Sequence, residues 1–180
     1  IYAAIYEGLT SYHPQTMQPV PGVAERWDVN ENSTEFVFHL RRNARWSNGD
    51  PITAHDFAYS FRRALSPELA SRNAYMSYEI QYAQAYNEGG VFVRNPATGQ
   101  WLLTSALDVE SSASPSLRLT LPGDAESREA AFAENPALRA LAEGQEFVPV
   151  RGADIGVDAI DDLTFRTSLA QPAPYLAGML

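Results

Sequence analysis

Histidines and cysteines are the residue types most able to bind a metal, and the chain offers few of them. It holds three histidines and no cysteine, so disulfides, thiol chemistry and thiolate metal sites are absent. Imidazole is a common metal ligand. His13, His39 and His55, however, fall in an expected loop, strand and helix start, and no two of them stand at short ligand spacing. We therefore expect no metal site.

Carboxylates gather near the end of the chain, where a calcium loop would be one interpretation. The residues concerned are Asp154, Asp158, Asp161 and Asp162. Their spacing differs from that of an EF-hand loop. Asp161 and Asp162 also separate two strand-like segments, where a hairpin turn favours aspartate. The pattern predicts turn chemistry.

Catalytic motifs are missing from the sequence. It contains no Gly-x-Ser-x-Gly elbow, no His-Glu-x-x-His pair and no phosphate-binding glycine loop. Glu126 and Glu129 form a pair of carboxylates, but they lie on an expected exposed helix and indicate a solvated face. We expect the protein not to be an enzyme.

Four tyrosines recur at steps of three and four residues: Tyr75, Tyr78, Tyr82 and Tyr86. Tyrosine offers an apolar ring and a hydroxyl that can bond a peptide carbonyl, which suits a sequence-tolerant binding site. The alternative is that all four rings pack along one face of a helix over residues 74–87.

Charge and composition exclude several partners. The formal net charge is −9 and hydrophobic residues make up 45% of the chain, as in an ordinary folded domain. A nucleic-acid binder needs a basic surface, and acidic lipids would repel this chain as well. No apolar run reaches the roughly 18 residues of a membrane span. We expect neither nucleic acid nor direct membrane binding.

Hydrophobic periodicity predicts hairpins mixed with helices. Expected hairpins join 26–29 to 34–40, 91–93 to 101–103 and 157–160 to 164–169, and Leu117–Leu121 alternates as a short strand. Helices are expected over 1–8, 53–65, 74–87, 125–133 and 136–143. Residues 9–24 and 111–116 are expected loops, and 47–51 is a tight turn with Gly49 at positive φ. Thr53 and Asp56 form a variant of the capping box.

The fold class that follows is α+β, a mixed antiparallel sheet with packed helices. The core is expected to hold Trp27, Phe36, Phe38, Trp46, Phe57, Phe61 and Phe165. We expect a single domain over 1–180, with 88–152 as an insertion within it. That insertion is either a tolerated surface addition, which loop thermodynamics permits at small cost, or a decoration that contacts a partner or covers a sheet edge. Both ends of the sequence have the character of element interiors, so we expect a piece of a longer protein.

A series of linked motifs resembles one family. The segments, in order, are Glu7–Leu9 (EGL), Pro21–Trp27 (PGVAERW), Phe36–Phe57 (FVFHLRRNARWSNGDPITAHDF), Val157–Phe165 (VDAIDDLTF) and Leu169–Leu176 (LAQPAPYL). They resemble the family-5 solute-binding proteins, the oligopeptide- and dipeptide-binding components of ABC importers. The resemblance covers residues 1–87 and 153–180. Most of these residues have local structural roles as turns, caps and core, so the motifs identify the fold more directly than the ligand.

The resemblance implies a two-lobed clamshell of the type II periplasmic-binding-protein architecture, of which this chain is the extra domain beside the N-terminal lobe. It implies capture of oligopeptides, delivery to ABC permease subunits, no cofactor, a monomeric state and a periplasmic or extracytoplasmic location with a lipid anchor or secretion. Tyr75–Tyr78 (YMSY) resembles a Tyr-Ala-Ser-Tyr segment of the oligopeptide binders, which makes Tyr75 the ligand-contact candidate. Residues 71–74, just before it, depart from the family's spacing.

Other functions remain open on the sequence. Within the family the ligand could be a dipeptide, a nickel complex, an oligosaccharide or an opine. A transcriptional regulator could use the same fold as its ligand-sensing half, with a DNA-binding domain ahead of Ile1. A hydrolase would need a catalytic Ser or His that the motifs do not indicate.

Overall fold

The computed structural model describes residues 7–107 and 115–179 of the chain. They form two compact units, one made of the described residues up to Phe61 together with those from Val157 onward, and one made of Arg62–Gly156. Each unit is described by itself. Among the described residues, no helix combines the length and apolarity that a membrane crossing requires.

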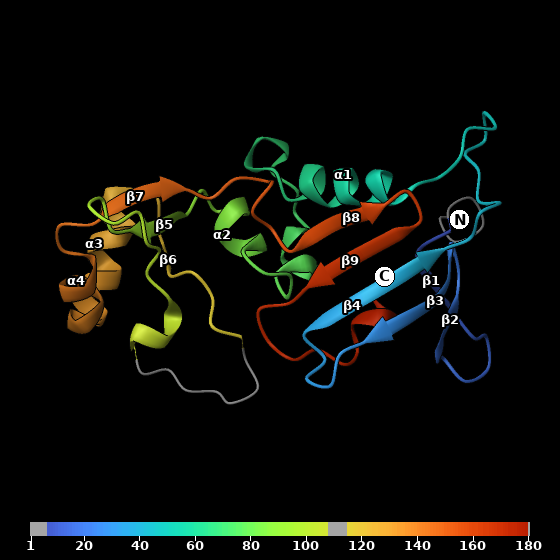
Figure 1. Ribbon diagram of the computed structural model, residues 1–180, viewed down its shortest axis with the longest axis horizontal. Helices are drawn as coiled ribbons and strands as arrows, with labels where there is room; N and C mark the ends of the chain where they lie inside the picture. The colour runs from blue at the N-terminus through green and yellow to red at the C-terminus, as the bar shows by residue number, and fades with distance from the viewer. Residues whose placement is uncertain (1–6, 108–114, 180) are drawn as a thin grey trace. The chain divides into compact units, whose positions relative to one another are not determined.

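The first unit is built around a four-stranded antiparallel sheet in the order β3-β4-β9-β8 (Figure 1). Its strands are β3 (Ala24–Val29), β4 (Glu35–Leu40), β8 (Val157–Asp161) and β9 (Thr164–Ser168). β3–β4 and β8–β9 are the hairpins predicted from the sequence, and β4 pairs with β9 at the centre. The predicted α+β class is confirmed.

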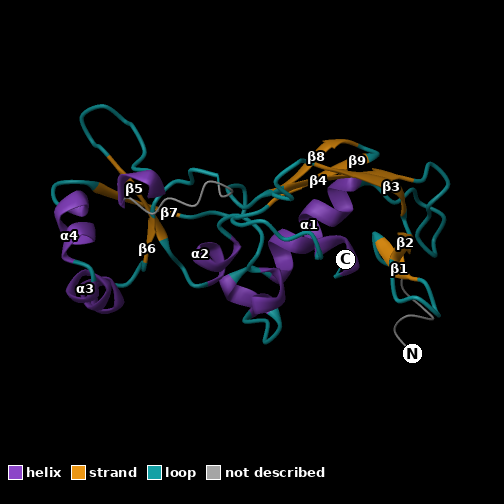
Figure 2. Cartoon of the chain, turned by 90° about the horizontal axis from the view of Figure 1, so that it is seen from below, coloured by secondary structure: helices purple, strands orange, loops and turns teal. Residues whose placement is uncertain are grey.

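One face of this sheet is apolar because alternate residues of its strands point the same way. Phe36, Phe38 and Phe165 are at most 1% exposed. Helix α1 (Ala54–Ala64) lies against that face (Figure 2). Its Phe57 and Phe61 rings have centroids 5.9 Å and 5.8 Å from the ring of Phe165.

The start of α1 is fixed as the capping-box variant predicts. The Asp56 carboxylate accepts hydrogen bonds from the Thr53 N–H at 2.8 Å and the Thr53 hydroxyl at 3.0 Å. The first backbone donor, Ala54 N–H, bonds to the Asp162 carbonyl at 2.8 Å. The preceding turn has Gly49 at φ 94°, the left-handed region that favours glycine. The turn prediction is confirmed.

Two short strands occupy the proline-rich segment that the sequence analysis assigned to loop. These are β1 (Thr10–Tyr12) and β2 (Pro19–Pro21), which pair antiparallel. The prediction fails because strands of three residues are too short to show an alternating pattern. The Thr10 hydroxyl donates to the Ala177 carbonyl at 2.6 Å, which ties β1 to the single turn of 3₁₀ helix at Leu176–Gly178.

The second unit contains a three-stranded sheet in the order β6-β5-β7. Its strands are β5 (Val91–Arg94), β6 (Thr120–Leu121) and β7 (Glu146–Pro149). Its helices are α2 (Ala83–Asn87), α3 (Ala125–Glu134) and α4 (Pro136–Ala142), with 3₁₀ turns at Pro67–Leu69, Ala74–Ser77 and Thr104–Leu107. α3 and α4 match the two predicted helices, each capped by a side chain, Asp124 and Asn135.

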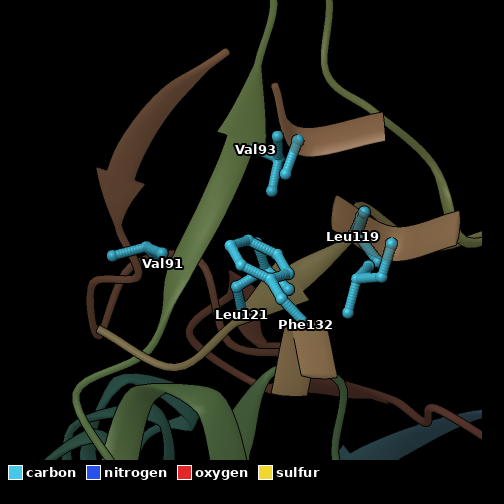
Figure 3. Close-up of a cluster of buried hydrophobic side chains, with 7 residues drawn as sticks. Val91, Val93, Leu119, Leu121 and Phe132 are labelled. Carbon is cyan, nitrogen blue, oxygen red and sulfur yellow. The ribbon is translucent and has the colours of Figure 1, made fainter. Parts of the chain in front are cut away.

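An apolar core joins this sheet to α3 and α4 (Figure 3). Figure 3 shows the Phe132 ring among the side chains of Val93, Leu119 and Leu121. Leu138 and Ala142 of α4 complete the cluster. The segment 88–152 therefore encloses an apolar core of its own.

The predicted helix over 74–87 is wrong. A 3₁₀ turn at Ala74–Ser77 and the short helix α2 replace it, because Tyr82 adopts φ 59° in the left-handed region. Tyrosine has a modest helix propensity. Here the Tyr82 hydroxyl also accepts a hydrogen bond from the Arg118 N–H at 2.9 Å, and its ring meets Phe92 edge-on. These tertiary contacts override the helical spacing.

The predicted core is right at its centre and wrong at one edge. Trp46 is 47% exposed, because it lies at the tight turn before Gly49 and not within the sheet. Trp27, Phe57 and Phe61 are half-buried. The predicted hairpin over 91–103 is present as β5 and a turn, but Trp101 forms only an isolated bridge with Arg94. The helix predicted over 1–8 and the loop over 111–116 fall largely outside the described residues.

Phe165→Ala should lower the free energy of unfolding by about 3–5 kcal/mol, because it empties a fully buried site that three other rings surround. Trp46→Ala removes a larger ring from an exposed position and should cost about 1 kcal/mol or less. Urea unfolding followed by circular dichroism measures both. Equal losses would contradict the assignment of the core.

Asp161 should make the stability of the β8–β9 turn depend on pH. Hydrogen bonds from the Leu163 N–H and the Thr164 hydroxyl lower the pKa of the Asp161 carboxyl. The stabilisation is complete above the ordinary aspartate pKa, about 3.9, and is lost as the pH falls through the lowered value. Asp161→Asn should therefore flatten the loss of stability between about pH 5 and pH 2. Asp162→Asn removes the same charge without these turn bonds and is the control.

Candidate functional site

The segment that carries the predicted ligand contact is a single exposed 3₁₀ turn, Ala74–Ser77. Ala74 is buried and anchors it, while the Tyr75 side chain is 65% exposed and Met76 is 53% exposed. The turn thus presents an aromatic ring, a hydroxyl and a thioether to the surroundings. Such a surface can bind apolar and polar groups without close selection between them.

The other three tyrosines pack inside the second unit. The Tyr78 hydroxyl donates to Asn87 Oδ1 at 2.7 Å, and Asn87 in turn donates to the Leu65 carbonyl at 3.0 Å. Burial, followed by the negative charge of Glu88, raises the pKa of Tyr78. Tyr82 contacts Phe92, and the Tyr86 ring lies close against Gly152. The packing interpretation thus fits three of the four tyrosines and leaves Tyr75 apart.

A groove of about 750 Å³ lies in the first unit where β4 ends and the β8–β9 turn begins. It is lined by Glu25, Arg26, His39, Leu40, Arg41, Arg42, Asn43, Asp161, Asp162, Leu163 and Thr164. His39 Nε2 lies 2.8 Å from Asp28 Oδ2, and Arg26 Nη1 lies 2.9 Å from the same oxygen. These two contacts, His39 first, lower the pKa of Asp28. The groove carries both signs of charge on exposed side chains.

A second cavity in the same unit, of about 470 Å³, lies beside the start of α1. Val23, Ile52 and Phe57 give it an apolar floor, and Trp46 is also part of its wall. Arg41 Nη2 contacts Glu7 Oε2 at 2.7 Å within that wall. Such a cavity can hold an apolar group.

The structure does not bring the three histidines together. His13 Nδ1 accepts N–H bonds from Gln15 and Thr16 in its own turn, His39 contacts Asp28, and His55 lies 3.5 Å from Asp162. The described residues contain no group of three or more His, Asp or Glu side chains that could hold a metal ion.

The four C-terminal aspartates serve separate local contacts. Asp154 accepts the Arg151 N–H at 2.9 Å, Asp158 pairs with Arg166 at 2.9 Å, and Asp161 closes the hairpin turn. The Asp158 contact raises the pKa of Arg166. The turn chemistry predicted for Asp161 is confirmed. The predicted solvated face also holds, since Glu126 and Glu129 are exposed on α3.

A third groove, of about 510 Å³, lies in the second unit along β7, and the sequence analysis missed it. Arg118 lies 4.8 Å from the ring centroid of Trp101 and 5.1 Å from that of Phe92. Arg94 lies 5.3 Å from the Trp101 centroid. The only sequence signal was the alternation of Phe92 with Arg94, because Trp101 comes to the groove, and Arg118 comes to Trp101, from separate segments.

Comparison with known proteins places the chain in a family. The family described as bacterial extracellular solute-binding proteins, family 5 Middle, matches residues 18–180. The periplasmic oligopeptide-binding protein OppA of Salmonella typhimurium is 31% identical over 163 residues, which is 90% of this chain and 19% of that protein. The dipeptide-binding protein DppE of Bacillus subtilis is 41% identical over 85 residues, 47% of this chain and 16% of that protein. The chain thus spans less than a fifth of either relative.

Solved structures of similar proteins share the fold. The substrate-binding domain of an oligopeptide ABC transporter from Bacillus anthracis aligns with a TM-score of 0.58 at 26% identity, over 95% of this chain and 21% of that one. OppA of Haemophilus influenzae aligns with a TM-score of 0.56 at 24% identity, over 98% of this chain and 24% of that one. The motif order, the observed hairpins and these similarities agree, and the chain belongs to the bacterial extracellular solute-binding proteins of family 5.

Proposed function

We propose that this chain is part of an extracytoplasmic solute-binding protein that captures oligopeptides and delivers them to an ABC importer. The observation that carries the proposal is the similarity to OppA along 90% of the chain. The family match over residues 18–180 spans both hairpins and the Tyr75 segment. OppA of Haemophilus influenzae was solved in complex with the peptide RPPGFSPFR, which names the ligand class to test.

The proposed mechanism is enclosure of the peptide by closure of two lobes, followed by docking of the closed form on the permease. The chain itself would contribute a rigid supporting domain and a limited ligand surface. Two observations support this assignment. The Tyr75 ring and hydroxyl are exposed and could contact a ligand, whereas most other motif residues build turns, caps and core. Within this part of the protein, we propose that 88–152 is an insertion, supported by its separate apolar core.

The family also bears on the proposed location, oligomeric state and lack of catalysis of the protein. We propose that the protein acts outside the cytoplasm, attached by a lipid anchor or secreted, as a monomer that uses no cofactor and catalyses no reaction. The support is the family itself, whose members are named for solute binding. Periplasmic proteins stand among the similar sequences.

A dipeptide is the second candidate ligand. The observation in its favour is the 41% identity to DppE, higher than the identity to OppA but over only 47% of the chain. The motifs that carry the family resemblance are largely turn, cap and core residues, so they discriminate poorly between ligands of different length.

The full-length protein should release peptides of several residues when it is denatured, and mass spectrometry of the released material identifies them. After refolding, calorimetric titration with RPPGFSPFR should show binding with a negative heat-capacity change, because enclosure buries apolar surface. The dipeptide Ala-Ala is the comparison ligand. Binding of the dipeptide alone would favour the second candidate, and a non-peptide ligand would contradict both.

Tyr75→Ala in the full-length protein should weaken peptide binding about tenfold, the effect of losing one aromatic contact and one hydrogen bond. Tyr75→Phe keeps the ring and should recover part of that loss. Tyr59→Ala is the matched control, since Tyr59 is 62% exposed and lies on α1. Unchanged affinity in Tyr75→Ala would show that Tyr75 makes no ligand contact.

A further inference from the structure

On its outer side, the edge strand β7 makes no backbone hydrogen bond with another strand of the described residues. It is last in the order β6-β5-β7, so it pairs with β5 on one side only (Figure 1). The Val150 N–H donates to the Gly90 carbonyl at 3.0 Å, and the register then alternates along the two strands. By that alternation Val148 bonds toward β5, whereas Phe147 directs its N–H and C=O away from β5.

Pro149 follows the same alternation and directs its carbonyl outward. A proline has no N–H to donate, and sheets accept it at edge positions where no ladder bond is needed. The outward groups of Phe147 and Pro149 are two residues apart, a spacing of roughly 6.8 Å along a strand. In another extended strand, the backbone groups that point to one side recur at this same spacing, so they can form hydrogen bonds with both residues.

The groove of about 510 Å³ runs along this same strand. Every residue of β7 lines it, together with Phe92, Arg94, Trp101, Arg151 and Asp154. Phe92 and Arg94 stand opposite Val148 and Glu146 in the register, so these four side chains share one face of the sheet. Val91 and Val93 point to the other face, into the apolar core against α3 and α4.

Aromatic rings and guanidinium groups are stacked at and beneath the floor of the groove. Arg118 lies over both Trp101 and Phe92, and Arg94 lies over Trp101. Arg94 is held by Glu146 at 2.8 Å and Arg118 by Asp154 at 3.4 Å. The floor is therefore fixed before any partner arrives, which lowers the entropic cost of binding.

The charge balance of this surface differs from that of the chain as a whole. Two arginines, Arg94 and Arg151, and two carboxylates, Glu146 and Asp154, line the groove, and Arg118 adds a guanidinium beside it through its contacts with Asp154 and Trp101, on a chain whose net charge is −9. Arg94 and Arg118 are paired with these carboxylates, whereas the Arg151 guanidinium makes no ion pair with any described residue. An acidic side chain of a partner can therefore pair with Arg151, whereas the net negative charge of the chain disfavours acidic partners elsewhere.

We propose that β7 and its groove bind an extended, acidic polypeptide segment, which adds a fourth strand to the three-stranded sheet. The outward N–H and C=O of Phe147 and the C=O of Pro149 pair with its backbone. Its inward side chains lie over Val148 and Trp101, and an acidic side chain meets Arg151. Addition of a strand at a sheet edge is an established mode of peptide recognition. The site lies wholly within the second unit, and Tyr75 is not among the residues that line it.

The test uses the full-length protein and a fluorescent, end-blocked heptapeptide of alternating valine and glutamate. Polarisation should show saturable binding that persists with RPPGFSPFR present in excess, which separates this site from the transport ligand. Hydrogen–deuterium exchange across 145–150 should slow when the probe binds, because the Phe147 N–H gains a partner. A probe N-methylated at alternate amides should not bind, since it cannot complete the strand ladder.

Charge reversal supplies the matched variants. Arg151→Glu should weaken the valine–glutamate probe about tenfold and improve binding of a valine–lysine probe. Arg72→Glu changes the same charge at an exposed position of the same unit outside the groove and should leave both probes unaffected.

Three results would overturn the proposal. The first is no binding at millimolar probe, and the second is binding indifferent to N-methylation and to Arg151→Glu. The third is slow exchange at Phe147 in the free protein, which would show that the edge is already covered. If that protection rises with protein concentration, the occupant is a second copy of the protein instead of an acidic segment.

Discussion

The pairing of β4 with β9 is the constraint on which the rest of the structure depends. A central strand must satisfy its N–H and C=O groups on both sides. β3 satisfies one side of β4 through a tight hairpin, but the other side is satisfied by β9, which follows only after residues 41–163. Everything between those strands must therefore leave the sheet and return to it.

The aromatic contacts of Phe165 make that return favourable. Phe165 stands opposite Phe38 in the register, and its ring also meets Phe57 and Phe61 of α1. Burial of this ring compensates part of the entropy lost in closing so long a loop, which grows only slowly with loop length. α1 is held at the same place, since its first N–H bonds to Asp162 in the β8–β9 turn. Sheet, helix and turn thus specify one another.

The second unit also packs helices against a sheet, but its three-stranded sheet is smaller and α3 and α4 cover only one of its faces. α3 and α4 cover one face of its sheet, and residues such as Phe132 and Leu138 fill that side. Arginine and aromatic side chains occupy the other face, where Tyr82, just before α2, also meets Phe92 edge-on. Three short strands leave unpaired edges, and a short, proline-ended strand is a common way to keep such an edge from aggregating. The shortness of β7 and its proline, which disfavour aggregation, also restrict what can bind it. A partner strand must place its backbone groups opposite the outward groups of Phe147 and Pro149.

The sequence by itself determined the local features whose causes lie within a few residues. The β3–β4 and β8–β9 hairpins, the cap at Thr53 and Asp56, the turn at Gly49 and helices α3 and α4 all follow from alternation, capping and turn chemistry. The family also followed, because its motifs are those local features in order. Tertiary structure alone decided that Tyr82 breaks the expected helix, that Trp46 lies at the surface, and that Trp101 and Arg118 meet at Phe92. Each of those outcomes rests on contacts between segments far apart in the chain, and periodicity carries no information about such contacts.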